Sequence, residues 1–260
     1  MLERIVSLEP SVTATLIALG QRHRLVSVTR HCRRLAEVGD LPQLDTTWSV
    51  KADAVAALAP DLVVAATPYQ AGSVDELLKA HLNVLCLYPQ TLADVYVHIC
   101  WLGRLCDVSA RADVLAARLQ AGLAALQAAA KGKPRQRVYV EEWPQPLISA
   151  APWIAEIVEV LGGEVVPQPP GRQVDELEVI QDDPQVIILN WAGTENIDPA
   201  RVTSRPGWER INAVRDGRVV AVDEILLNAP GPNLVEGALQ VWGALYPDES
   251  PPSLALPRES

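Results

Sequence analysis

Short apolar runs alternate with stretches of helical spacing through the first third of the chain. The runs 62–66 and 84–87 are apolar on both faces, which is typical of strands buried inside a parallel sheet. A helix over 15–19, capped by Ser11 or Thr13, is expected after the first run. The pattern predicts a parallel sheet covered by helices, with strands at 5–8, 25–28, 62–66 and 84–87 and further helices at 50–58 and 74–82.

The alternation stops between 92 and 131, where no strand pattern occurs. The segment 110–130 is rich in Ala, Leu and Arg and has apolar residues at helical spacing. An uninterrupted helix of about 20 residues spans roughly 30 Å, which is long enough to connect two lobes. We therefore expect one long, rigid helix in the middle of the chain.

Strand and helix patterns resume after 134. The predicted strands are 138–140, 165–166, 186–189 and 219–222, and the predicted helices are 153–161, 174–181, 208–211 and 234–245. The predicted fold class is α/β, with two Rossmann-like lobes of mainly parallel sheets and a ligand cleft between them. The expected organisation is an N-terminal lobe 1–108, a connecting helix 109–131, a C-terminal lobe 132–247 and a loose tail 248–260.

The residues that follow each predicted strand are the candidates for a binding site, because ligands of open parallel sheets bind outside the carboxyl ends of the strands. Tryptophan recurs there, in a chain with seven Trp and no Phe. Small-ligand sites are mostly apolar and aromatic with a few polar groups, and a flat tetrapyrrole suits such a site. The candidate ligand-binding residues are Glu9, Pro10, Ser11, His31, Trp48, Tyr69, Glu142, Trp143, Trp191, Glu224 and Asn228.

Charge and composition exclude several classes of function. The net charge is −10 and the pI is about 4.9, whereas a protein that binds nucleic acid carries a basic face. No apolar run reaches the roughly 18 residues that span a membrane. The four Cys form no CxxC motif, so free and mostly buried thiols are expected. We expect no nucleic-acid partner and no membrane insertion.

The N-terminus carries no charged region followed by an apolar stretch of about 7–15 residues, so no secretory signal is recognised. This favours a cytoplasmic protein. If the sequence is a trimmed mature form, a periplasmic or cell-surface location is expected instead.

Four segments resemble, in order, the family of cobalamin and iron-siderophore receptors of ABC importers, which have a helical backbone between two lobes. They are RIVSLEPSVTAT at 4–15, VKADAVAALAPDLVVA at 50–65, RVYVEEWPQPLISAA at 137–151 and RPGWERINAVRDGRVVAVD at 205–223. The resemblance runs from about 4 to 245. It implies a substrate-binding protein, not an enzyme, with no obligatory cofactor and an ABC transporter permease as a possible partner.

Within that family the chain is most similar to the cobalamin branch, because Trp48 and Trp143 fall where cobalamin receptors place aromatic residues. The resemblance therefore implies a corrinoid ligand, cobalamin above all. The chain departs from the family at two points: Ala71 stands near one of the acidic docking positions, and Ala229 stands where the family often has Arg. Glu176 or Glu178 could serve at the second docking position.

Three alternatives stay open at this stage. The ligand could be an iron-siderophore or haem. The chain could be a tetrapyrrole-metal chelatase that uses His31 with Glu142 or Glu224, since imidazole is a common metal ligand. His31 is a weak candidate for metal ligation, and the residues predict no catalytic set. The fold could also have lost its ligand and serve as an interaction module.

Overall fold

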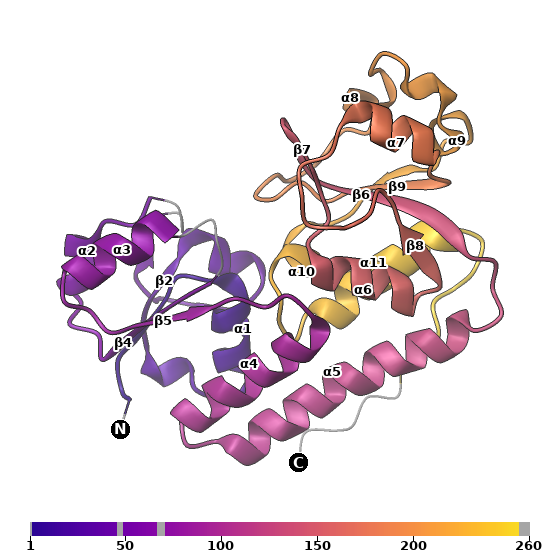
Figure 1. The fold of residues 1–260 in the computed structure, drawn as a ribbon. Coiled ribbons are helices and arrows are strands. Elements are labelled where there is room, and N and C mark those ends of the chain that lie inside the picture. The colour runs from indigo at the N-terminus through magenta and orange to yellow at the C-terminus, as the bar shows by residue number, and fades with distance from the viewer. Residues whose placement is uncertain (1, 46–48, 67–70, 255–260) are drawn as a thin grey trace. The chain divides into compact units, whose positions relative to one another are not determined.

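The computed structural model describes residues 2–45, 49–66 and 71–254 of the chain. It divides into two compact units, each an α/β fold. The first comprises Met1–Ala117 with Ala229–Asn233, and the second comprises Arg118–Asn228 with Leu234–Ser260. Each unit is described by itself below, and Figure 1 labels the elements of both.

The first unit contains a five-stranded parallel sheet with the order β3-β2-β1-β4-β5. The chain moves outward from β1 to β3 and then crosses to β4 on the other side of β1. Such a reversal between two neighbouring strands is the place where open α/β sheets bind ligands. The strands are β1 Ile5–Ser7, β2 Leu25–Thr29, β3 Gln43–Leu44, β4 Leu62–Ala66 and β5 Val84–Leu87.

Both faces of this sheet are buried because successive side chains of a strand point to opposite faces. Val64 packs with helices α1 and α4 on one face, and Val63 packs with α2 and α3 on the other. The prediction of a parallel sheet covered on both sides is confirmed. The helical elements are α1 Pro10–Ala18, η1 Arg22–Arg24, η2 Arg30–Arg34, α2 Ala52–Ala56, α3 Ala71–Lys79 and α4 Leu92–Leu105.

The start of α1 corrects a prediction. The helix begins at Pro10, with Glu9 as an extended N-cap residue and no side-chain capping bond, so Ser11 and Thr13 are not caps. They lie inside the helix and are buried. Proline is well suited to the first helical position, because its φ is already helical and its missing N–H needs no partner there.

The predicted long helix is confirmed as α5 Ser109–Ala130, and the two units divide within it, between Ala117 and Arg118. It follows α4, whose N-terminus is fixed by a capping box. The Thr91 hydroxyl accepts from the Asp94 amide at 3.1 Å, and the Asp94 carboxylate accepts from the Thr91 amide at 2.9 Å.

The second unit has a mixed sheet with the order β10-β9-β6-β7, and β8 pairs with the beginning of β6. All its pairings are parallel except that of β6 with β7, which forms a hairpin that the sequence did not predict. The strands are β6 Gln136–Pro144, β7 Leu147–Ser149, β8 Gly163–Val165, β9 Val186–Leu189 and β10 Val219–Ala221.

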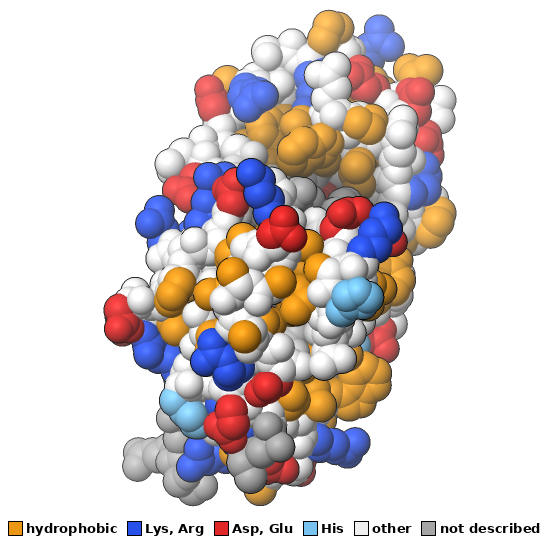
Figure 2. All heavy atoms as spheres, turned by 90° about the vertical axis from the view of Figure 1, so that its left-hand side faces the viewer, with side chains coloured by type: hydrophobic (Ala, Val, Ile, Leu, Met, Phe, Trp, Pro, Cys, Tyr) orange, Lys and Arg blue, Asp and Glu red, His pale blue; other side chains and the backbone are white. Residues whose placement is uncertain are grey.

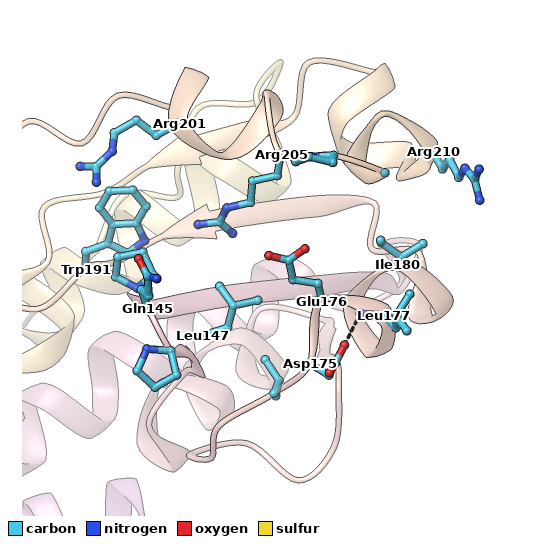
Figure 3. A pocket seen from close by; sticks show the side chains of 15 residues that line it. Gln145, Leu147, Asp175, Glu176, Leu177, Ile180, Trp191, Arg201, Arg205 and Arg210 are labelled. Atoms are coloured by element: carbon cyan, nitrogen blue, oxygen red, sulfur yellow. Dashed lines mark hydrogen bonds between the residues drawn. The ribbon is translucent and has the colours of Figure 1, made fainter.

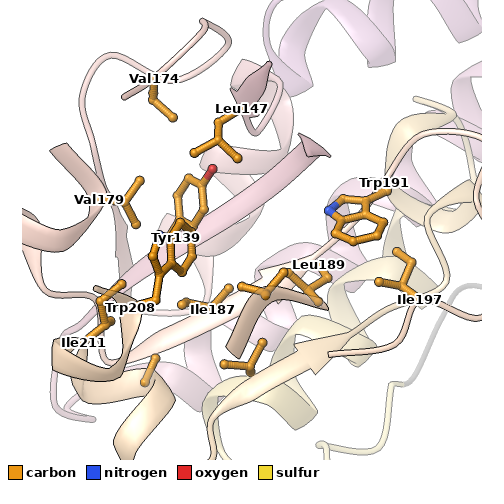
Figure 4. Packing of buried hydrophobic residues seen from close by; sticks show 13 residues of the cluster. Tyr139, Leu147, Val174, Val179, Ile187, Leu189, Trp191, Ile197, Trp208 and Ile211 are labelled. Atoms are coloured by element: carbon orange, nitrogen blue, oxygen red, sulfur yellow. The ribbon is translucent and has the colours of Figure 1, made fainter. Parts of the chain in front are cut away.

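Helices cover both faces of this sheet as well. The face that carries Tyr139, Leu189 and Trp191 packs against α7, α8, η4 and α9, and Trp208 is part of the same core (Figure 4). The helical elements of the unit are α6 Pro152–Val160, α7 Glu176–Asp182, α8 Ala200–Thr203, η4 Trp208–Arg210, α9 Asn212–Arg215, α10 Ile225–Asn228 and α11 Leu234–Leu245.

Charged side chains of both signs are interspersed with apolar ones on the face shown in Figure 2. Helix α4 contributes exposed apolar side chains at Val97, Trp101 and Leu105, one turn apart. Trp101, the middle one of the three, is 43% exposed. Cys32 and Cys106 are buried, whereas Cys86 is exposed, so the expectation of mostly buried thiols holds for only part of the set. Among the helices of the described residues, none combines the length and apolarity that crossing a membrane requires.

Candidate functional site

The strand ends of the first unit are lined by small hydroxyl and thiol side chains. The Thr13 hydroxyl donates to Ser7 Oγ at 2.8 Å and lies 3.1 Å from Cys32 Sγ, and Thr29 Oγ1 lies 3.3 Å from the same sulfur. Burial raises the pKa of the Cys32 thiol above its ordinary value, so the thiol stays protonated. This network holds β1, α1 and η2 together at the strand ends.

The predicted site residues of the first unit lie around this network. Glu9 is half-buried after β1, Pro10 and Ser11 are buried in the first turn of α1, and His31 is half-buried in η2 after β2. Trp48 and Tyr69 lie outside the described residues.

A buried ion pair organises the strand ends of the second unit. Glu141, near the end of β6, is fully buried and accepts two hydrogen bonds from the Arg205 guanidinium, at 2.6 and 2.8 Å. Its Oε1 also accepts from the Trp191 indole N–H at 2.9 Å. Burial alone would lower the pKa of Arg205, but the hydrogen bonds to Glu141 and the nearby negative charges, that of Glu141 first, together raise it. The guanidinium therefore stays charged, and its hydrogen bonds to Glu141 hold the carboxylate that fixes the indole in place.

The Glu141 carboxylate also affects the pKa of Tyr139, two residues earlier in β6. Burial, and then the negative charge of Glu141, hold the pKa of Tyr139 well above its usual range. The Tyr139 ring packs edge-on against Trp208, with 6.1 Å between the ring centroids. Tyr139 is therefore a neutral member of the core.

An amide network occupies the opposite face of the same strand ends. The Asn190 side chain donates to Asn228 Oδ1 at 2.6 Å, and Asn228 donates to the Asn190 carbonyl at 3.0 Å. Glu224 is buried beside them and accepts from Asn228 at 3.3 Å. The structure thus brings together two predicted site residues, Glu224 and Asn228.

Glu142 and Trp143 follow Glu141 toward the hairpin. Glu142 is buried, and its carbonyl accepts from the Ala192 amide at 3.1 Å. Trp143 is 41% exposed, and its indole N–H donates to the Gln145 carbonyl at 2.9 Å. This hydrogen bond anchors one edge of a large aromatic side chain at the surface of the strand ends.

A pocket of about 830 Å³ lies beside the hairpin, entirely within the second unit. Trp191 and Gln145 line one end of it, and Arg205 and Glu176 line its middle (Figure 3). Arg201 lies over the Trp191 ring, with its guanidinium carbon 4.6 Å from the ring centroid. Trp191 itself is only 1% exposed, so Arg201 is the group that this end presents to the pocket.

The comparisons with known proteins decide the family. The family model described as "Periplasmic binding protein" matches residues 5–226. This chain belongs to that family. The predicted resemblance is therefore confirmed.

Similar members of the periplasmic binding protein family cover nearly the whole chain. The uncharacterized ABC transporter substrate-binding lipoprotein YvrC of Bacillus subtilis is 29% identical over 264 residues, which are 95% of this chain and 81% of the relative. The vitamin B12-binding protein of Vibrio parahaemolyticus is 24% identical over 257 residues, which are 92% of this chain and 88% of the relative. The structure of a periplasmic haem-binding protein from Pseudomonas aeruginosa matches with a TM-score of 0.81 and 25% identity, over 98% of this chain and 97% of that one.

Three arginines line the pocket, Arg201, Arg205 and Arg210, and sequence reasoning assigned none of them to a site. Arg201 lies in a segment that the sequence left without assignment because its helix α8 has only four residues, whereas Arg205 opens the segment 205–223 that resembles the family. Arg205 and Glu141 are 64 residues apart in the chain, so no local pattern links them. Within the described residues, no group of three or more His, Cys, Asp or Glu could hold a metal ion.

Proposed function

We propose that this member of the periplasmic binding protein family binds a corrinoid, cobalamin above all, without changing it chemically. The observation that carries the proposal is Trp143, a half-exposed indole at the end of the central strand β6 that is held by a hydrogen bond to the Gln145 carbonyl. The relatives named vitamin B12-binding protein support the same ligand class.

Trp143 suits a large flat ligand for physical reasons. A ligand that covers its exposed surface removes apolar area from water, and the indole is already oriented, so little conformational entropy is lost on binding. A corrin ring carries amide side chains, which need both donors and acceptors. Asn228 and Glu224, which follow β10 in the same sheet, carry such groups.

Haem is the second candidate, because the similar structure from Pseudomonas aeruginosa is described as a haem-binding protein. Haem differs from a corrinoid in its ionised propionates, and the cation Arg201 beside Trp191 would favour them. Iron-siderophores stay as a third ligand class to test.

We further propose that the chain delivers its ligand to an ABC transporter and works outside the cytoplasmic membrane. The relative from Bacillus subtilis, named an ABC transporter substrate-binding lipoprotein, supports this role. Ligand uptake by cells that lack the gene for this chain would fall in a labelled-ligand transport assay. Unchanged uptake would contradict the delivery role and leave the binding proposal intact.

The direct test is a titration of the protein with cyanocobalamin, haemin and a ferric siderophore, followed by ligand absorbance. We expect cyanocobalamin to bind saturably and Trp143→Ala to weaken binding about tenfold or more, because a buried Trp contact at an interface contributes roughly 2 kcal/mol. Trp101→Ala is the matched control, since Trp101 is similarly exposed at 43% but lies within helix α4 of the first unit. Tight binding of haemin with no response to cyanocobalamin would replace the corrinoid by haem.

A further inference from the structure

The second unit contains several arginines, and most of them have their donors occupied. Arg205 donates hydrogen bonds to the Glu141 carboxylate. Arg172 donates to the Glu178 carboxylate and to the Gln168 carbonyl. Arg218 donates to Gln136 and to two carbonyls at the end of α11. These guanidinium groups are structural, because their hydrogen bonds are made within the unit.

Arg201 differs from them. Its guanidinium is held over the Trp191 ring, and no described residue accepts a hydrogen bond from its side chain. The contact with the ring uses none of the guanidinium N–H groups in a hydrogen bond, and these groups have the planar arrangement that matches a carboxylate or phosphate. The cation is thus oriented but has no anion.

The support beneath Arg201 is rigid. Trp191 is 1% exposed and its N–H is bound to Glu141, which in turn is fixed by two bonds from Arg205. Tryptophan is also the ring that attracts a cation most strongly. A flexible surface arginine would lose side-chain entropy on binding an anion, whereas this side chain has lost part of it already.

The surroundings of Arg201 leave room for a ligand group. It lines the pocket of about 830 Å³ at the end that also carries the Gln145 side chain. The carboxylates of the pocket, Asp175 and Glu176, lie farther along it in Figure 3, where Glu176 points toward Arg205. Asp175 accepts from the Leu177 amide at 2.8 Å as the N-cap of α7.

We infer that Arg201 binds an anionic oxygen group of the ligand, either a tetrapyrrole carboxylate or a phosphodiester, beside the hairpin that carries Trp143. This inference rests on the proposed function and deepens it, since it assigns a charge to one part of the ligand. The carboxylate and the phosphodiester both offer a pair of anionic oxygens to the guanidinium. Ligands that lack one of these groups tell them apart. Cobinamide is a corrinoid without the phosphodiester, and haem dimethyl ester is a haem without free carboxylates.

The test compares the wild-type protein with Arg201→Gln and with Arg215→Gln. Arg215 is an exposed arginine on α9 outside the pocket, so its variant makes the same change in net charge. Each protein is titrated with cyanocobalamin, cobinamide, haemin and haem dimethyl ester at low and high salt. Arg201→Gln is expected to weaken binding of the anionic ligand roughly tenfold at low salt and less at high salt, because a charge-assisted hydrogen bond is lost and its strength is screened.

The outcomes separate the inference from the function on which it rests. Weaker binding of cyanocobalamin but not of cobinamide would assign the group to the phosphodiester, and weaker binding of haemin but not of its ester would assign it to the carboxylate. Unchanged affinity of Arg201→Gln at both salt concentrations would overturn the inference and leave the proposed function standing. The same holds if the uncharged analogues lose affinity equally, since packing would then explain the loss. No binding of any ligand to the wild-type protein would overturn both.

Discussion

The two units share a plan of parallel strands between helices, but their strand ends differ in chemistry. In the first unit, small neutral groups such as Thr13 and Cys32 bond to one another. In the second unit, an ion pair between Glu141 and Arg205 and an amide pair between Asn190 and Asn228 lie at the strand ends. The first arrangement buries no charge, whereas the second buries charges and holds large polar side chains in fixed orientations. Under the proposed function, this difference predicts that the second unit determines which ligand groups are recognised.

The largest expected effect is that of Glu141→Ala on stability. The substitution leaves Arg205 with a largely buried and unpaired charge, and breaking such a pair costs about 3–5 kcal/mol. Chemical denaturation followed by tryptophan fluorescence measures the change in free energy of unfolding. Glu159→Ala, at an exposed position of α6, is the control and is expected to change it by less than about 0.5 kcal/mol.

The double variant Glu141→Leu with Arg205→Met sharpens this prediction. It removes both charges together and is expected to recover most of the lost stability, because no buried charge is left unpaired. If Glu141→Ala unfolds at the same denaturant concentration as the wild type, the ion pair does not organise this unit.

Asn228→Ala is expected to have the next largest effect. The fully buried Asn190 amide loses its acceptor at 2.6 Å, and a buried donor without a partner costs about 1–2 kcal/mol. Chemical denaturation measures the loss in free energy of unfolding. The slope of that free energy against denaturant concentration should stay the same, because the fold is retained. If this variant is as stable as the wild type, the amide pair does not contribute to the free energy of unfolding.

Thr13→Val tests the first unit and is expected to cost only about 0.5–1 kcal/mol. The shape of the side chain is kept, and Ser7 retains its bond to the Glu9 carbonyl at 3.0 Å, so no strong acceptor is left alone. The same denaturation experiment measures it. A loss as large as that of Glu141→Ala would remove the contrast between the two units.

The smallest effect concerns an exposed ion pair on the second unit. The Arg172 guanidinium, and then the Asp175 amide, lower the pKa of Glu178 from its ordinary value of 4.5 to about 2. A carboxyl whose folded pKa is lowered stabilises the fold above its unfolded pKa, and this contribution is lost as the pH falls from about 4.5 toward 2. Arg172→Ala should therefore raise the pKa of Glu178 toward 4.5, as measured by carboxyl NMR titration. An unchanged pKa would contradict this assignment.

The sequence predicted much of the fold because several strands, such as β4, β5 and β9, are short apolar runs. Strands β4, β5 and β9 and helix α11 have the predicted bounds, since buried parallel strands and an apolar helix depend on local composition. It missed β7, which has three residues and pairs in an antiparallel hairpin. Runs of that length carry no period of their own.

The candidate site was harder to predict than the fold. Trp143 and Trp191 were recognised because they follow the predicted strands 138–140 and 186–189, although β6 in fact continues through Trp143 to Pro144. Their environments differ: Trp143 is exposed, and Trp191 is buried under Arg201. That difference depends on Glu141 and Arg205, which meet only through the tertiary structure. Single-sequence patterns report periodicity and turns, and they carry no information on pairs so distant in the chain.

The central claim is that ligand binding occurs at the strand ends of the second unit, on Trp143. The most direct measurement is an NMR titration of the indole N–H signals of the seven Trp residues with the ligand that binds. The account predicts that the Trp143 signal shifts and saturates with the affinity seen by absorbance, while the signals of Trp101 on α4 and of the buried Trp208 stay in place. Saturable binding that leaves the Trp143 signal unmoved would contradict it.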